Sequence, residues 1–198
     1  MAKKEITKED IIDIDSYIKQ RDLIKKNIKV HKNNRRVHVG PHATFYFESF
    51  DTMLYQVQEM LFIERGGLEQ MQDELKAYNP LIPTGKSLVV TLMFEIDNPN
   101  IRKKFLNSVG GIEKSTFIQL GEKKIYARAE DDTDRTTEDG KASSVHFLHF
   151  DFDDNEKELF AKNETEVLLG FDHQNYHHVS ALSENIKASL VNDFDLGS

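Results

Sequence analysis

Residues 144–153 read Ser-Val-His-Phe-Leu-His-Phe-Asp-Phe-Asp, and this stretch determines which fold the neighbouring segments can build. Alternate side chains of a strand point to opposite faces, so His146 lies with Leu148 and Phe150 on one face. His149 lies on the other face, which is also largely apolar. Two apolar faces predict a strand in the middle of a sheet. Each histidine is then either a hydrogen-bonded core residue or a group that can bind a metal or carry a proton.

The same order of elements follows this strand and an earlier one. In the first unit, 86–129, a strand is predicted at 88–96, a helix at 100–109 and a hairpin at 116–120 and 124–129. In the second unit, 144–183, a strand is predicted at 144–152, a helix at 156–161 and a hairpin at 166–171 and 176–182. A last helix is predicted over 184–191. This alternation is typical of an α+β fold with a mixed, mainly antiparallel sheet. The two units are interpreted either as an internal repeat or as a chance similarity between two α+β segments.

A long helix is predicted over residues 51–65, and its apolar residues fall on two sides. At 100° per residue, one side carries Met53, Val57, Met60 and Leu61, and the nearly opposite side carries Tyr55 and Phe62. A helix with two apolar sides is normally buried on both, so we expect this one at the centre of the molecule. The polar residues between these sides lie either at the edges of the helix or in a polar site.

The N-terminal region, residues 1–35, is predicted as a helical arm that precedes a single α+β domain at 36–198. An isoleucine stripe between Ile11 and Ile18 indicates a first helix, and a second is expected over 21–31.

Charge is divided unevenly along the chain, whose net charge is −8. Residues 18–38 hold eight lysines and arginines against one aspartate, which leaves about −15 on the remainder. The basic segment is expected to pack on its own acidic body, on a second copy in a two-fold homodimer, or on an anionic partner. The acidic balance argues against general binding to nucleic acid.

Composition excludes several classes of site. The 198 residues contain no cysteine, which excludes disulfides, thiolate zinc sites, iron–sulfur ligation and a cysteine nucleophile. The N-terminus lacks the apolar stretch of a signal peptide, and no apolar segment is long enough to cross a membrane. We therefore expect a cytoplasmic protein without membrane contact.

Polar residues in otherwise apolar elements are the best candidates for a ligand site. We expect a pocket where the 51–65 helix meets the sheet, between Glu59 and His146, because buried polar groups need a partner, a water molecule or a ligand. The residues expected to bind the ligand are Gln56, Glu59, Arg128, Arg135, Thr136 and His146. The alternative is a closed polar network that only fixes the helix on the sheet.

A metal site is less well indicated. Its candidate ligands are His42, His146, Asp172 and His173, and none of them shows a diagnostic spacing such as His-Glu-x-x-His. A carboxylate-bridged diiron centre would need Glu-x-x-His pairs on neighbouring helices, which the sequence lacks. No cofactor is assigned.

Several short motifs carry a resemblance to a known family. They lie at 39–48, 51–52, 56–61, 63–65, 74–75, 78–83, 111–113, 135–137, 145–148, 172–173 and 176. Together they span nearly the whole chain and resemble the bacterial domain-of-unknown-function family 3501. The chain departs from the family at Gln174, where proline is frequent, and at His149, where arginine is usual. The resemblance implies a small cytoplasmic bacterial protein, often encoded near rubrerythrin-like and iron–sulfur oxidoreductase genes.

Two functions follow as hypotheses. The first, which the resemblance implies, is an accessory or binding protein that acts beside a redox or diiron partner of the rubrerythrin type in peroxide and iron metabolism under oxidative stress. The alternative is a metal- or small-anion-binding enzyme or sensor that uses the pocket between the central helix and the sheet. A binding module without catalysis would use the same pocket.

Overall fold

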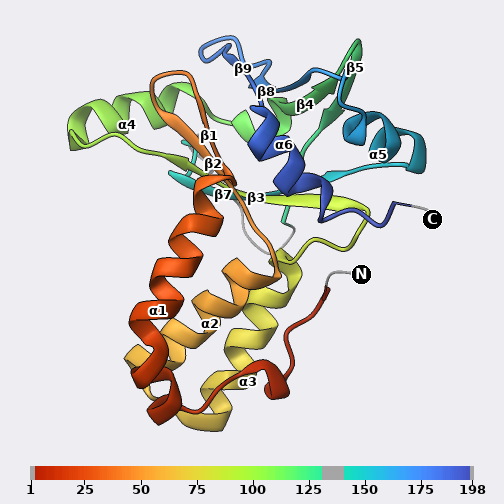
Figure 1. The fold of residues 1–198 in the computed structure, drawn as a ribbon. Coiled ribbons are helices and arrows are strands. Elements are labelled where there is room, and N and C mark those ends of the chain that lie inside the picture. Colours follow the sequence, from red (N-terminus) through yellow and green to blue (C-terminus); the bar gives the residue numbers. More distant parts are fainter. Residues whose placement is uncertain (1–2, 131–140, 197–198) are drawn as a thin grey trace.

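Two antiparallel sheets and a layer of three helices dominate the computed structural model, which describes residues 3–130 and 141–196 (Figure 1). The first sheet has the order β1 (Arg36–Val39), β2 (Ala43–Phe47), β3 (Ser87–Phe94), β7 (Val145–Asp151) and β6 (Arg128–Ala129). The second has the order β5 (Lys123–Tyr126), β4 (Thr116–Leu120), β8 (Val167–Phe171) and β9 (Val179–Ala181). The expected α+β class is confirmed, but the strands form two sheets where one was predicted.

The helices are α1 (Ile14–Asn33), α2 (Phe50–Glu64), α3 (Gly67–Tyr78), α4 (Pro99–Ser108), α5 (Asp154–Ala161) and α6 (Glu184–Val191). Short 3-10 turns lie at Lys8–Asp10, Asn79–Leu81 and Ile112–Ser115. Helices α1, α2 and α3 lie side by side below the first sheet in Figure 1, with α2 in contact with both neighbours. Among the described residues, no helix combines the length and apolar character needed to span a bilayer.

The main core lies between the two sheets, and a smaller apolar cluster lies between the first sheet and the helical layer. Leu148 and Phe150 of β7 belong to the main core. Val57 and Leu61 of α2 belong to the smaller cluster, and Phe147 of β7 packs against it. Strand β7 therefore contributes to both, because its alternate side chains point to opposite faces. The central position of α2 agrees with the prediction.

Helix α1 is continuous where two helices were predicted. Its N-cap residue, Asp13, accepts a hydrogen bond from the Ser16 N–H at 2.9 Å. Residues 19–22 contain neither glycine nor proline. Extending an existing helix through such a segment costs less free energy than nucleating a second one.

The segment predicted as one strand over 124–129 is divided between the two sheets. Its first part, β5, pairs with β4, whereas Arg128 and Ala129 pair with β7. The Ala127 N–H still donates to the Thr116 carbonyl at 2.8 Å, so the chain changes sheets after this residue. Alternation of side chains predicts a strand but does not show which neighbour it will join.

The order strand, helix, hairpin is present in both predicted units. β3, α4, β4 and β5 follow one another in the first unit, and β7, α5, β8 and β9 in the second, apart from β6, which precedes β7. Equivalent strands also pair, β3 with β7 and β4 with β8. The internal repeat stays a prediction. The division of the chain into a helical arm (1–35) and a single domain (36–198) also stays a prediction.

Candidate functional site

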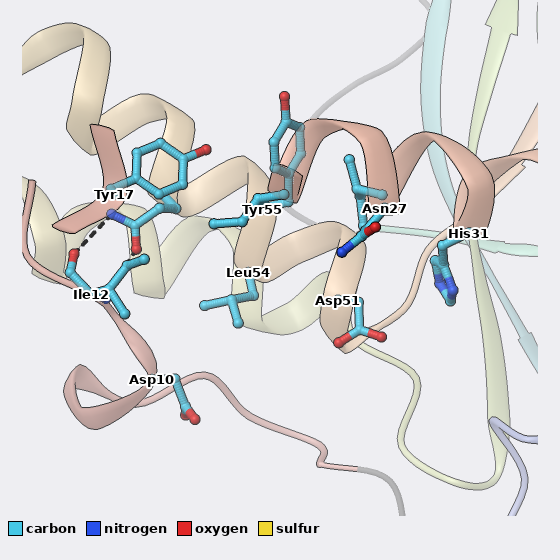
Figure 2. A pocket seen from close by; sticks show the side chains of 11 residues that line it. Asp10, Ile12, Tyr17, Asn27, His31, Asp51, Leu54 and Tyr55 are labelled. Carbon is cyan, nitrogen blue, oxygen red and sulfur yellow. Dashed lines mark hydrogen bonds between the residues drawn. The ribbon is translucent and has the colours of Figure 1, made fainter. Parts of the chain in front are cut away.

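A pocket of about 350 Å³ lies between α1 and α2, with the N-terminal segment as its third side (Figure 2). It is lined by Asp10 and Ile12 of that segment, by Tyr17, Ile24, Asn27, Ile28 and His31 of α1, and by Asp51, Leu54, Tyr55 and Gln58 of α2. Aliphatic and aromatic side chains form most of the wall. In Figure 2, Asn27, His31 and Asp51 lie at one end, away from Ile12 and Tyr17.

Two polar contacts join α1 to α2, one at each end of the pocket. At the first, Glu59 accepts hydrogen bonds from the Tyr17 hydroxyl at 2.6 Å and from the Arg21 guanidinium at 2.7 and 2.8 Å. At the second, the His31 Nε2 lies 2.9 Å from the Ser49 Oγ. The pocket lies between these two contacts.

The Glu59 carboxylate therefore belongs to a contact between helices. The hydrogen-bonded Arg21 guanidinium lowers the pKa of Glu59 to about 2, against the opposing effect of burial. The carboxylate is ionised at neutral pH. The stability that it contributes is present above the ordinary pKa of glutamate and is lost as the pH falls toward 2.

The N-terminal segment is held over the helices by two side-chain amides. The Gln58 amide accepts from the Ile12 N–H at 3.1 Å and donates to the Ile12 carbonyl at 3.0 Å, the latter drawn as a dashed line in Figure 2. The Asn79 amide forms the same pair of hydrogen bonds with Ile6: it accepts from the Ile6 N–H at 2.8 Å and donates to the Ile6 carbonyl at 3.1 Å. Each amide satisfies both backbone groups of one residue, as a neighbouring strand would. Residues 6–12 are thereby fixed beside the pocket.

His31 gives the polar end of the pocket its chemistry. Burial, followed by the charge of Arg35, lowers the pKa of His31, while Asp51 acts in the opposite direction. The imidazole is therefore neutral at pH 7 and can either donate or accept one hydrogen bond at each nitrogen. The Ser49 hydroxyl beside it also accepts from the Thr52 N–H at 3.3 Å and caps α2, which ties this hydroxyl to the fold.

His146 lies in the main core between the sheets, not in the helical layer. It is fully buried, and its Nε2 lies 2.9 Å from the Ser143 carbonyl. Its Nδ1 lies 4.0 Å from an oxygen of Glu113. Glu59 lies on the opposite side of the first sheet, because β7 presents Phe147 rather than His146 to the helices. The predicted convergence of Glu59 and His146 is therefore wrong.

The remaining predicted ligand residues are dispersed. Gln56 lines a second cavity, of about 370 Å³, where α2 meets the first sheet. A cavity therefore exists where one was expected, but neither Glu59 nor His146 lines it. Arg128 is exposed on β6 and forms an ion pair with Asp151 at 3.3 Å. Arg135 and Thr136 lie outside the described residues.

The candidate metal ligands face different partners. His42 stacks on Tyr176, with ring centroids 6.4 Å apart, and Asp172 pairs with Lys124 at 2.8 Å. The Nε2 of His173 lies 3.3 Å from the Gly110 carbonyl. Within residues 3–130 and 141–196, no group of three histidine or carboxylate side chains could hold a metal ion.

The sequence patterns do not predict Asn27, His31 and Asp51 as site residues. A usable signal is present in α1, where Ile24, Asn27, Ile28 and His31 follow the spacing of one helix face. Polar residues at two of these four positions indicate that this face meets a cavity or solvent as well as a packed neighbour.

Comparison with known proteins adds a family and a fold. The family model described as "Protein of unknown function (DUF3501)" matches residues 5–194. The chain is also similar to a solved structure described as a novel protein of unknown function from Burkholderia pseudomallei K96243. The identity is 34%, the TM-score is 0.88, and the match covers 96% of this chain and 99% of that chain. No curated protein matches the chain significantly.

Proposed function

The chain belongs to this DUF3501 family, and from that premise we propose that it is a binding protein whose pocket between α1 and α2 takes a small, largely apolar ligand with a polar end. The carrying observation is the cavity itself, of about 350 Å³, which lies between two interhelical contacts. Its size is at the lower end of the range for small-molecule sites, which are mostly apolar with a few placed polar groups.

The polar end supports a ligand with a hydroxyl or amide group. Because its Nε2 contacts Ser49, neutral His31 offers the ligand its Nδ1 as one donor or one acceptor, and the Asn27 amide offers both kinds of group. The Asp51 carboxylate is exposed, and within the described chain it makes no ion pair. Such a ligand would bury its apolar body against Ile24, Ile28 and Leu54.

Filling the pocket tests the proposal directly. The substitution Ile28→Trp places an indole in the cavity and should weaken binding of the neutral fluorescent probe N-phenyl-1-naphthylamine by about tenfold or more, because the apolar area available to the probe is lost. Leu23→Trp is the matched control, since Leu23 lies on the same helix and is 62% exposed. It should bind the probe as the unmodified protein does.

The fluorescence of the introduced tryptophan also shows whether its indole is buried or exposed in each variant. The chain contains no tryptophan, so the emission of the introduced indole comes from a single position. Blue-shifted emission at position 28 with red-shifted emission at position 23 would show that the first indole is buried as intended. Unchanged probe binding by a folded Ile28→Trp variant would contradict the proposed site.

A role beside a redox partner of the rubrerythrin type is the second part of the proposal. It is supported by the family resemblance and by the basic α1, which presents Leu23 and Val30 to solvent among lysines. Affinity purification from the native host under mild conditions should recover a diiron or iron–sulfur protein. Recovery of neither class would count against this role. A cytoplasmic location and a homodimer also stay predictions.

A further inference from the structure

The cavity between α2 and the first sheet contains a buried carboxylate, and its surroundings point to a ligand class. The cavity is lined by Lys32, Arg35, Tyr46, Phe47, Glu48, Thr52, Met53, Gln56, Tyr78, Leu81, Thr91, Met93, Val145 and Phe147. Helix α2 provides one side, and strands β2, β3 and β7 provide the facing side. It lies on the opposite face of α2 from the pocket of Figure 2, since its α2 residues (52, 53 and 56) and those of that pocket (51, 54, 55 and 58) point to opposite sides at 100° per residue.

Glu48 is the acidic residue of this cavity, and two hydroxyl groups of the described chain donate to its carboxylate. The residue is 8% exposed. The Thr52 hydroxyl donates to Oε2 at 2.7 Å, and the Thr91 hydroxyl donates to Oε1 at 2.6 Å. Each oxygen has a second lone pair, so the carboxylate can accept further hydrogen bonds. The two threonines come from α2 and β3 and hold the carboxylate in a fixed orientation.

Two cations also line this cavity, and their recorded contacts are with other groups. The Arg35 guanidinium bonds to the backbone carbonyls of Phe47 and Glu48 and forms its ion pair with Asp193. The Lys32 ammonium lies over the Tyr55 ring, 5.4 Å from its centroid. In the described part of the chain, Glu48 has no ion pair with any basic side chain. A buried carboxylate without a counter-ion is costly, so a cation that entered the cavity would be favoured.

The walls suit the body of an organic cation. Tyr46, Tyr78 and Phe147 provide aromatic rings, and Met53 and Met93 provide flexible, polarisable side chains. Aromatic rings around a carboxylate attract an ammonium group through their π-electrons as well as through its charge. We propose that this cavity binds a small organic ammonium ion, whose charged nitrogen lies against Glu48 and whose apolar part contacts the tyrosine and methionine side chains.

The competing role for Glu48 is structural. A carboxylate that accepts from Thr52 and Thr91 also links the start of α2 to β3. A purely structural carboxylate would give the cavity no preference between a charged ligand and a neutral ligand of the same shape. The preference for charge therefore separates the two roles.

Methionine methyl signals provide the site-specific readout. In protein labelled with ¹³C at the methionine methyl groups, Met53 and Met93 report the cavity, whereas Met60 and Met71 lie outside it. Benzylammonium should shift the Met53 and Met93 signals and leave the other two in place. Benzyl alcohol, which has nearly the same shape without the charge, should bind about tenfold or more weakly, because its neutral hydroxyl can form neither an ion pair with the carboxylate nor a cation–π contact with the rings.

Two matched variants test whether the charge of Glu48 causes the preference for benzylammonium over benzyl alcohol. Glu48→Gln keeps the size of the side chain and an acceptor for a threonine hydroxyl, and it should remove the preference for benzylammonium. Glu95→Gln is the control, because Glu95 also accepts from two hydroxyls on this face of the sheet, those of Thr44 and Tyr46, but lies outside the cavity. It should retain the full preference.

The outcomes are decisive in either direction. Equal affinities for benzylammonium and benzyl alcohol in the unmodified protein would overturn the proposal, and this comparison holds even where Glu48→Gln fails to fold. Shifts confined to Met60 or Met71 would overturn it as well, as would a folded Glu48→Gln variant that still prefers the cation. A charge preference that disappears in Glu48→Gln and persists in Glu95→Gln would support it.

Discussion

Replacing Arg35 with methionine is expected to destabilise the protein by about 3–5 kcal/mol, the usual cost of removing one partner of a buried ion pair. The side chain is 2% exposed. Its Nε donates to the Phe47 carbonyl at 3.0 Å, and its Nη2 donates to the Glu48 carbonyl at 2.7 Å and pairs with Asp193. Methionine fills a similar volume but leaves these three oxygens without their donor. Chemical denaturation of both proteins would measure the loss.

The loss should depend on pH in a defined direction. Burial raises the pKa of Asp193, and the Arg35 guanidinium opposes that rise. Without Arg35, the folded-state pKa of Asp193 rises further, so the folded state binds this proton more tightly than the unfolded state does. The destabilisation should therefore be complete at about pH 8 and smaller at about pH 5.

A double variant separates the ion pair from the other contacts of Arg35. Adding Asp193→Asn to Arg35→Met removes the stranded charge, so the double variant should be more stable than Arg35→Met alone. A double variant that is less stable than Arg35→Met, together with a loss that does not change with pH, would show that Asp193 is not the main partner.

Replacing Leu61 with alanine is expected to cost about 2–5 kcal/mol. Leu61 is 5% exposed and belongs to the smaller apolar cluster, with Met53 and Val57. Truncation removes buried methyl groups and leaves a cavity that the two fixed ends of α2 cannot easily close. The measurement is the midpoint and slope of denaturant unfolding.

Ile63→Ala is the control for this prediction. Ile63 lies on the same helix and is 64% exposed, so its truncation should change the free energy of unfolding by no more than about 0.5 kcal/mol. Equal losses for the two variants would mean that Leu61 is not packed in the smaller apolar cluster.

Local pattern was sufficient to predict most of the elements. The helix over 184–191 has the predicted limits, because apolar periodicity and the residues that flank it mark both of its ends. The same reasoning could not show that residues 124–129 serve two sheets. Pairing depends on contacts between distant segments, and side-chain alternation is the same in either sheet.

The candidate site was less accessible to sequence reasoning. Glu59 is a polar residue on a largely apolar helix, which indicates a special environment but not its nature. Its partners, Tyr17 and Arg21, are 42 and 38 residues away, and no local rule connects them. The pattern correctly places His146 on a strand in the middle of a sheet. Both faces of that strand are apolar, so the pattern does not show which face meets the helices.

The pairing of β3 with β7 has a consequence for synthesis on the ribosome. β2 is synthesised before β3 and can pair with one edge of β3 as soon as β3 is made. β7, the partner of the other edge, begins about 50 residues after β3 ends. At typical elongation rates, the other edge of β3 stays open for roughly 3–10 s. That edge belongs to an apolar strand with unpaired N–H and C=O groups, which is a template for aggregation between nascent chains. The time between the synthesis of residue 94 and that of residue 145 is thus the time during which this edge lacks its partner strand.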